Sequence, residues 1–160
     1  MERKQSPTTK GIKKSFTTTR LPSPPPGEEE SGGAASEQNH LILIVDDVVD
    51  NLALISLDLQ QLGYRVVTAS DGEKAVRVAS LTKPDIILMD IAMPGVDGLE
   101  ATRQIREDGK LRAIPIIAIT AYSTGGFQRA AADAGFDGYL SKPIDFDRLH
   151  ELIRSLLPNS

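Results

Sequence analysis

The chain has 160 residues, of which 40% are hydrophobic and none is cysteine. This length fits one domain of ordinary size, and the lack of cysteine excludes disulfide bonds and thiolate chemistry. With only two histidines, a structural zinc site is a poor interpretation. No apolar stretch approaches the roughly 18 residues of a membrane span, and the N-terminus lacks the apolar segment of a secretory signal. We therefore expect a cytoplasmic protein.

The first 38 residues differ in composition from the rest of the chain. Residues 1–20 carry six Lys or Arg against one Glu, and residues 21–38 are rich in Pro, Gly, Ser and Glu. Because this segment has almost nothing to bury, residues 1–38 are predicted to be a disordered tail or linker. Residues 39–160 contain 17 Asp or Glu and 12 Lys or Arg, a net charge of −5. An acidic domain of this kind is a poor candidate for direct binding of nucleic acid.

Beyond residue 40, short apolar runs alternate with helical patterns. The runs are continuous, which is typical of parallel strands buried on both faces. The predicted strands are Leu41–Val45, Arg65–Ala69, Asp85–Met89, Pro115–Ile119 and Phe136–Leu140. Apolar residues three or four positions apart predict five helices, which contain Leu52–Leu62, Ala75–Ala79, Leu99–Arg106, Gln128–Ala134 and Leu149–Leu156. Asp71 is a predicted N-cap, and Gly63 and Gly135 are predicted to end helices.

Five successive β–α units predict an α/β fold, with a doubly wound parallel sheet covered by helices on both faces. Right-handed crossovers leave few topologies, and a five-stranded unit of this size fits the flavodoxin-like strand order 2-1-3-4-5. In that order the first and third strands are neighbours at the topological switch point. Ligands bind there, outside the carboxyl ends of the strands.

Three aspartates are predicted to meet at this edge of the sheet. Asp46 and Asp47 follow the first strand, and Asp90 follows the third. Two carboxylates about 4 Å apart repel each other by roughly 4 kcal/mol at an effective dielectric near 20. Such a cluster must bind a cation, take up a proton or spread apart, and a hard divalent cation is the simplest partner for oxygen ligands. Alternatively, Asp46 or Asp47 could cap the following helix.

Two further polar residues follow strands at the same edge. Thr120 follows the fourth predicted strand, and Lys142 follows the fifth. Together with the acids they suit a phosphoryl group on a carboxylate beside a divalent metal. The metal offsets negative charge, the ammonium pairs with the phosphoryl group, and the hydroxyl donates a hydrogen bond to it. A carboxylate nucleophile that forms an aspartyl phosphate is known chemistry.

The chain resembles the receiver domains of two-component response regulators, the CheY-like family, in five segments. These segments are LILIVDDVVDN, DGEKAV, PDIILMDIAMPGVDGLE, PIIAITAYS and AGFDGYLSKPID. The resemblance covers Leu41 to about Pro158, so residues 39–160 are predicted to form one receiver domain. It implies a signalling protein rather than an enzyme. In such a protein Asp90 would accept a phosphoryl group from a phosphohistidine on a histidine kinase or histidine phosphotransfer protein.

Mg²⁺ is the cofactor that the resemblance implies. Its implied ligands are the carboxylates of Asp46, Asp47 and Asp90 and the backbone carbonyl of Ala92. Thr120 and Lys142 would contact the phosphoryl oxygens, and Tyr139 would be an aromatic switch residue that moves inward as the threonine shifts. The Lys142–Pro143 bond resembles one that is often cis in this family. A downstream protein would read the altered surface of the fourth helix, fifth strand and fifth helix, where a homodimer could also form on phosphorylation.

Other interpretations of the acidic cluster stay open at this point. A haloacid-dehalogenase-like phosphatase needs a second aspartate two residues after the nucleophile, whereas Val48 and Ala92 stand at those positions. A flavodoxin needs a hydroxyl- and glycine-rich phosphate loop, whereas DDVVDN repels phosphate unless a metal intervenes. A phosphorylation-independent adaptor with a receiver fold is the third alternative. No output module follows the last predicted helix, which favours a stand-alone regulator over the receiver of a hybrid histidine kinase.

Overall fold

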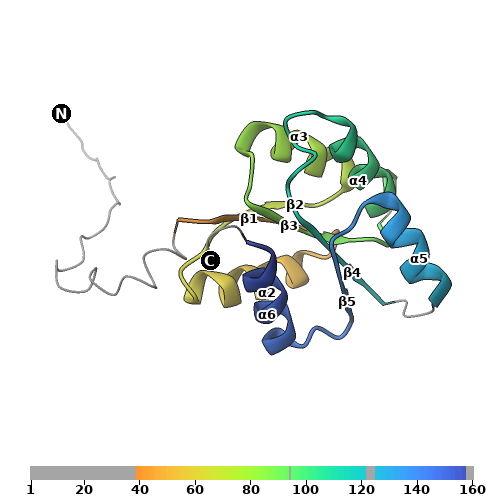
Figure 1. The fold of residues 1–160 in the computed structure, drawn as a ribbon. Helices are drawn as coiled ribbons and strands as arrows, with labels where there is room; N and C mark the ends of the chain where they lie inside the picture. The colour runs from red at the N-terminus through yellow and green to blue at the C-terminus, as the bar shows by residue number, and fades with distance from the viewer. Residues whose placement is uncertain (1–38, 94, 122–124, 158–160) are drawn as a thin grey trace, which may run out of the picture. The chain divides into compact units, whose positions relative to one another are not determined.

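The computed structural model describes residues 39–93, 95–121 and 125–157 (Figure 1). Its elements are β1 (Leu41–Val45), α2 (Val49–Gln61), β2 (Arg65–Ala69), α3 (Gly72–Thr82), β3 (Ile86–Asp90), α4 (Gly98–Glu107), β4 (Ile116–Thr120), α5 (Gly125–Ala134), β5 (Gly138–Ser141) and α6 (Phe146–Leu156). The five strands form one parallel sheet in the order β2-β1-β3-β4-β5, which confirms the predicted topology. The predicted tail, residues 1–38, lies outside the described residues. Within the described ranges, no helix combines the length and apolar character needed to cross a bilayer.

The strand bounds match the prediction at β1 and β2 and differ from it at β3 to β5. β3 and β4 begin and end one residue later than predicted, so Asp90 and Thr120 are the last residues of strands. β5 begins at Gly138 rather than at Phe136. The backbone N–H of Phe136 donates instead to the carbonyl of Ala131, so this residue closes the end of α5. The backbone of Phe136 is therefore used by the helix end and not by the sheet.

Aspartates and glycines set the ends of several helices. Asp71 Oδ1 accepts a hydrogen bond from the backbone N–H three residues later, so this residue is the N-cap of α3, as predicted. Gly63 and Gly135 follow α2 and α5 with positive φ values of 98° and 106°, which confirms both predicted helix ends. α5 begins at Gly125 rather than at Gln128. Glycine is a poor helix former, so the sequence pattern did not mark this helix start.

Alternate residues of each strand face opposite sides of the sheet, and this divides the core into two layers. On β1, Ile42 and Ile44 face one side, whereas Leu43 and Val45 face the other. α2 and α6 cover the first side, and α3 and α4 cover the second (Figure 1). The buried helix residues of the two layers are Ile55, Leu59, Leu149 and Ile153 on the first side and Ala75, Ala79, Ala101 and Ile105 on the second. Because helices cover both faces of the sheet, a functional site is expected at the ends of the strands, which the helices do not cover.

Candidate metal and phosphorylation site

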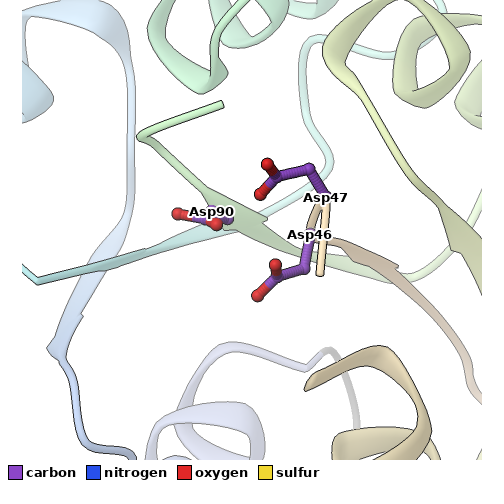
Figure 2. A group of neighbouring side chains, drawn as sticks. All are labelled: Asp46, Asp47 and Asp90. Carbon is purple, nitrogen blue, oxygen red and sulfur yellow. The ribbon is translucent and has the colours of Figure 1, made fainter. Parts of the chain in front are cut away.

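The acidic cluster lies at the carboxyl end of the sheet. β1 pairs with β3 so that Val45 lies opposite Met89, and the residues that follow them come together. One carboxylate oxygen from each of Asp46, Asp47 and Asp90 lies within 4.8 Å of the other two, and the three side chains point to the same side of the strand ends (Figure 2). Asp46 and Asp90 are only 2% and 4% exposed. Two of the three negative charges are therefore largely removed from water.

Asp46 is held by the start of α2. Its Oδ1 accepts a hydrogen bond from the backbone N–H of Val48 at 2.8 Å, and its Oδ2 accepts one from the side-chain amide of Asn51 at 3.1 Å. The N-cap residue of α2 is Val48, which makes no side-chain cap hydrogen bond, so the alternative that Asp46 or Asp47 is the N-cap is wrong. Asp46 instead orders the turn that leads from β1 into the helix.

One ammonium group lies between two of the carboxylates. Lys142 Nζ is 3.4 Å from Asp90 Oδ2 and 3.6 Å from Asp46 Oδ2. The backbone N–H of Lys142 donates to the carbonyl of Thr120 at 2.8 Å, which brings the lysine to the edge that carries the acids. The Lys142–Pro143 peptide bond is cis, the isomer that the resemblance describes as frequent at this position. A single positive charge does not balance three carboxylates, so this cluster has an excess of negative charge.

The pKa of Asp90 is raised above its ordinary value of 3.8. Burial is the largest cause, and the nearby charge of Asp46 is the second. The ammonium of Lys142 and the backbone N–H of Ala92, which donates to Asp90 Oδ1 at 3.2 Å, act in the opposite direction. Asp90 is therefore more basic than an ordinary surface aspartate, and its charged form gains from a nearby cation.

Asp90→Asn is expected to raise the free energy of unfolding at neutral pH when no divalent cation is present. Because the pKa is raised, the folded state binds the Asp90 proton more tightly than the unfolded chain, so ionisation of Asp90 destabilises the fold. The variant removes this penalty, and its advantage should shrink as the pH falls through the raised pKa toward 3.8. Urea unfolding of both proteins over a pH series measures the difference. A variant less stable than the wild type at neutral pH would contradict the expectation.

The two predicted switch residues lie on neighbouring strands. Thr120 is buried at the end of β4, where it is paired with Ser141 of β5. Tyr139 is half-buried on β5 opposite Ala118, and it lines a cavity of about 340 Å³ beside α5. Thr120 therefore lies at the edge that holds the acids, and Tyr139 lies two residues before the end of the adjacent strand. The inward movement of Tyr139 stays a prediction.

The cluster fits a hard divalent cation. Its members offer carboxylate oxygens, which Mg²⁺ prefers, and within the described residues no sulfur or ring nitrogen belongs to the group. The negative charge left over after Lys142 is counted attracts a cation further. Of the residues near the acids, sequence reasoning missed Asn51. The available signal was an amide five positions after Asp46, in the first turn of the following helix.

The response regulator receiver domain family matches residues 42–154, a range that contains the acidic cluster, Thr120 and Lys142. The chain belongs to this family. The resemblance to CheY-like receiver domains is thereby confirmed, and the protein contains a signalling module of two-component systems. Membership of this family decides against the phosphatase and flavodoxin interpretations, since neither of those proteins is a receiver domain.

Two curated relatives and one solved structure illustrate the similarity of this receiver domain to known proteins. Polar-differentiation response regulator DivK of Brucella anthropi is 38% identical over 113 residues, which cover 71% of this chain and 92% of DivK. Response regulator PleD of Caulobacter vibrioides is 40% identical over 112 residues, which cover 70% of this chain and 25% of PleD. The receiver domain of sensor histidine kinase PA1611 from Pseudomonas aeruginosa PAO1 was solved with a magnesium ion coordinated in its active site cleft. It matches with a TM-score of 0.69 at 39% identity, over 73% of this chain and 96% of that structure.

Proposed function

We propose that this receiver domain accepts a phosphoryl group on Asp90 from a phosphohistidine of a histidine kinase or histidine phosphotransfer protein. The observation that carries the proposal is the Lys142 ammonium, which lies 3.4 Å from Asp90 Oδ2 within an acidic cluster. An ammonium in that position pairs with the charge of a phosphoryl group attached to the aspartate. The same chemistry serves a stand-alone regulator and the receiver of a hybrid histidine kinase.

Asp90 is the better acceptor of the two buried aspartates. Both oxygens of Asp46 accept hydrogen bonds from the start of α2. Asp90 accepts one from the backbone N–H of Ala92 at Oδ1 and one at Oδ2 from the Lys142 ammonium, the group proposed to pair with the phosphoryl charge. The raised pKa of Asp90 also makes its carboxylate more basic, which favours nucleophilic attack. Transfer forms a bond between an Asp90 oxygen and phosphorus and breaks the phosphorus–nitrogen bond of the phosphohistidine. The electron pair of that bond returns to the imidazole, which leaves as a neutral ring after protonation.

The acidic cluster is the proposed Mg²⁺ site, with ligands from the carboxylates of Asp46, Asp47 and Asp90 and the backbone carbonyl of Ala92. Bound Mg²⁺ supplies positive charge that offsets the acids and the phosphoryl oxygens. The magnesium ion in the PA1611 receiver supports this assignment. Asp46 and Asp47 then bind the cation, whereas Asp90 is both a ligand and the acceptor.

Thr120 and Tyr139 are the proposed switch. The Thr120 hydroxyl donates to a phosphoryl oxygen when that group is present, and Tyr139 then moves toward the space beside it. Phosphorylation thereby shifts the population between two arrangements of α5, β5 and α6. The cavity of about 340 Å³ at this face is lined from all three elements, which suits it to contact with a downstream protein or with a second copy of the domain.

Incubation of the protein with acetyl phosphate and Mg²⁺ tests the proposed function. Intact-mass spectrometry should show one added phosphoryl group per chain, and no addition when EDTA replaces Mg²⁺. The product should be stable in acid and labile in alkali, as an acyl phosphate is, and peptide mapping after borohydride reduction should locate it at Asp90. A phosphoryl group on a different residue, or an equal yield in EDTA, would contradict the proposal.

A further inference from the structure

We propose that Asn51 is a positioning residue that fixes the Asp46 carboxylate for cation binding, an inference that rests on the proposed Mg²⁺ site. Asn51 lies in the first turn of α2 and is half-buried. Its side-chain amide donates to Asp46 Oδ2 at 3.1 Å. The residue would act through Asp46 rather than as a ligand of the cation.

The geometry around Asp46 shows a carboxylate bound at both oxygens by neutral donors. Oδ1 accepts from the backbone N–H of Val48 at 2.8 Å, and Oδ2 accepts from Asn51. The backbone N–H of Asn51 also donates to the carbonyl of Val48 at 3.0 Å. The backbone of Asn51 is therefore held by the same turn as Asp46, so only the side-chain torsions of Asn51 must be ordered when its amide binds Asp46.

The role of Lys142 explains why a second donor on Asp46 matters. The ammonium is shared, at 3.6 Å from Asp46 Oδ2 and 3.4 Å from Asp90 Oδ2. When the lysine pairs with a phosphoryl group on Asp90, Asn51 still holds Asp46 in place. A neutral amide orients the carboxylate without cancelling its charge, so the attraction for a cation is kept. Partners of this kind, which orient a metal ligand, typically change metal affinity by 10–100-fold when removed.

Asp47 provides a contrast within the same cluster. This carboxylate is exposed, and within the described ranges no group donates a hydrogen bond to it. The cluster therefore combines one ligand with a preset orientation, Asp46, and one that can adjust to the cation, Asp47. The preset ligand depends on Asn51.

Magnesium affinity measured by titration calorimetry tests the role of Asn51. Asn51→Leu keeps a similar side-chain shape and removes the donor, and it should weaken Mg²⁺ binding by about tenfold. The matched control is Gln60→Leu, the same exchange of an amide for leucine at an exposed position of α2, which should bind Mg²⁺ as the wild type does. Asn51→Ala, which favours a helix more than Asn, carries the same expectation if the leucine variant does not fold.

A double-mutant cycle separates positioning from packing, because Asn51 also lines a hollow of about 260 Å³ beside Leu54 and Phe146. If Asn51 acts through Asp46, then Asn51→Leu should have no further effect on Mg²⁺ affinity in an Asp46→Asn background. An equal loss of Mg²⁺ affinity in both backgrounds, or wild-type affinity in the Asn51→Leu variant, would overturn the role of Asn51 and leave the proposed metal site standing. A wild-type protein that binds no Mg²⁺ would overturn the proposed metal site together with it.

Discussion

Asp90→Asn is expected to abolish phosphoryl transfer from acetyl phosphate in the presence of Mg²⁺. Asparagine has nearly the shape of aspartate, and its oxygen can still accept the backbone hydrogen bond from Ala92. The amide has no anionic oxygen to attack phosphorus, so the reaction loses its nucleophile. Intact-mass spectrometry should therefore show the added phosphoryl group on the wild type and none on the variant.

The loss can be assigned to chemistry because the variant is expected to be at least as stable as the wild type. Asp85→Asn is a matched control, since Asp85 lies at the other end of β3 and its carboxylate accepts a hydrogen bond from the backbone of Leu41 at 2.7 Å. The Asp85→Asn protein should gain one phosphoryl group from acetyl phosphate, as the wild type does. Acid-stable, alkali-labile label on the Asp90→Asn protein would refute Asp90 as the acceptor.

Gly98→Ala is expected to lower the free energy of unfolding by about 3 kcal/mol, at the upper end of typical overpacking costs. Gly98 is the first residue of α4, and its backbone N–H donates to the carbonyl of Ile91 at 3.1 Å. A Cβ atom at this position would lie 2.4 Å from the carbonyl oxygen of Asp90 and 2.8 Å from Ile91 Cα. Both contacts are with backbone, so no flexible side chain can move aside. Urea unfolding monitored by circular dichroism measures the change.

Gly109→Ala provides the matched control for Gly98→Ala. A Cβ atom at Gly109 would meet the end of the Arg112 side chain at 3.8 Å, an ordinary contact, so the change should stay within about 0.5 kcal/mol. Because the clash at Gly98 involves the backbone of Asp90, that variant should also bind Mg²⁺ more weakly under conditions where it stays folded. Equal unfolding midpoints for the two alanine variants would show that α4 can move away from Asp90 at little cost.

The acidic cluster could be predicted because two simple rules converge on it. Continuous apolar runs identify buried parallel strands, and the switch point of a 2-1-3-4-5 sheet brings the ends of the first and third strands together. Asp46 and Asp90 are the polar residues at those two ends. Their proximity follows from topology and needs no knowledge of side-chain orientation. Thr120 and Lys142 could be placed at the same edge for the same reason.

Two of the boundaries that were wrong lie at residues whose local preference opposes the observed structure. Phe136 is apolar and suits a strand, yet its backbone N–H closes the end of α5. Gly125 is a weak helix former, yet α5 begins there. In both cases the local preference is small, and at Phe136 a single backbone hydrogen bond to Ala131 outweighs it.

By itself, the sequence determined the class of fold, the strand order and the meeting of three acids at one edge, because hydrophobic burial follows the spacing of apolar residues and takes no account of fine geometry. Only the tertiary structure decided how the acids differ. Asp46 is held by Asn51, and Lys142 lies between Asp46 and Asp90. These relations depend on the orientation of individual side chains after the helices have packed. The spacing of residues in the sequence does not specify such orientations.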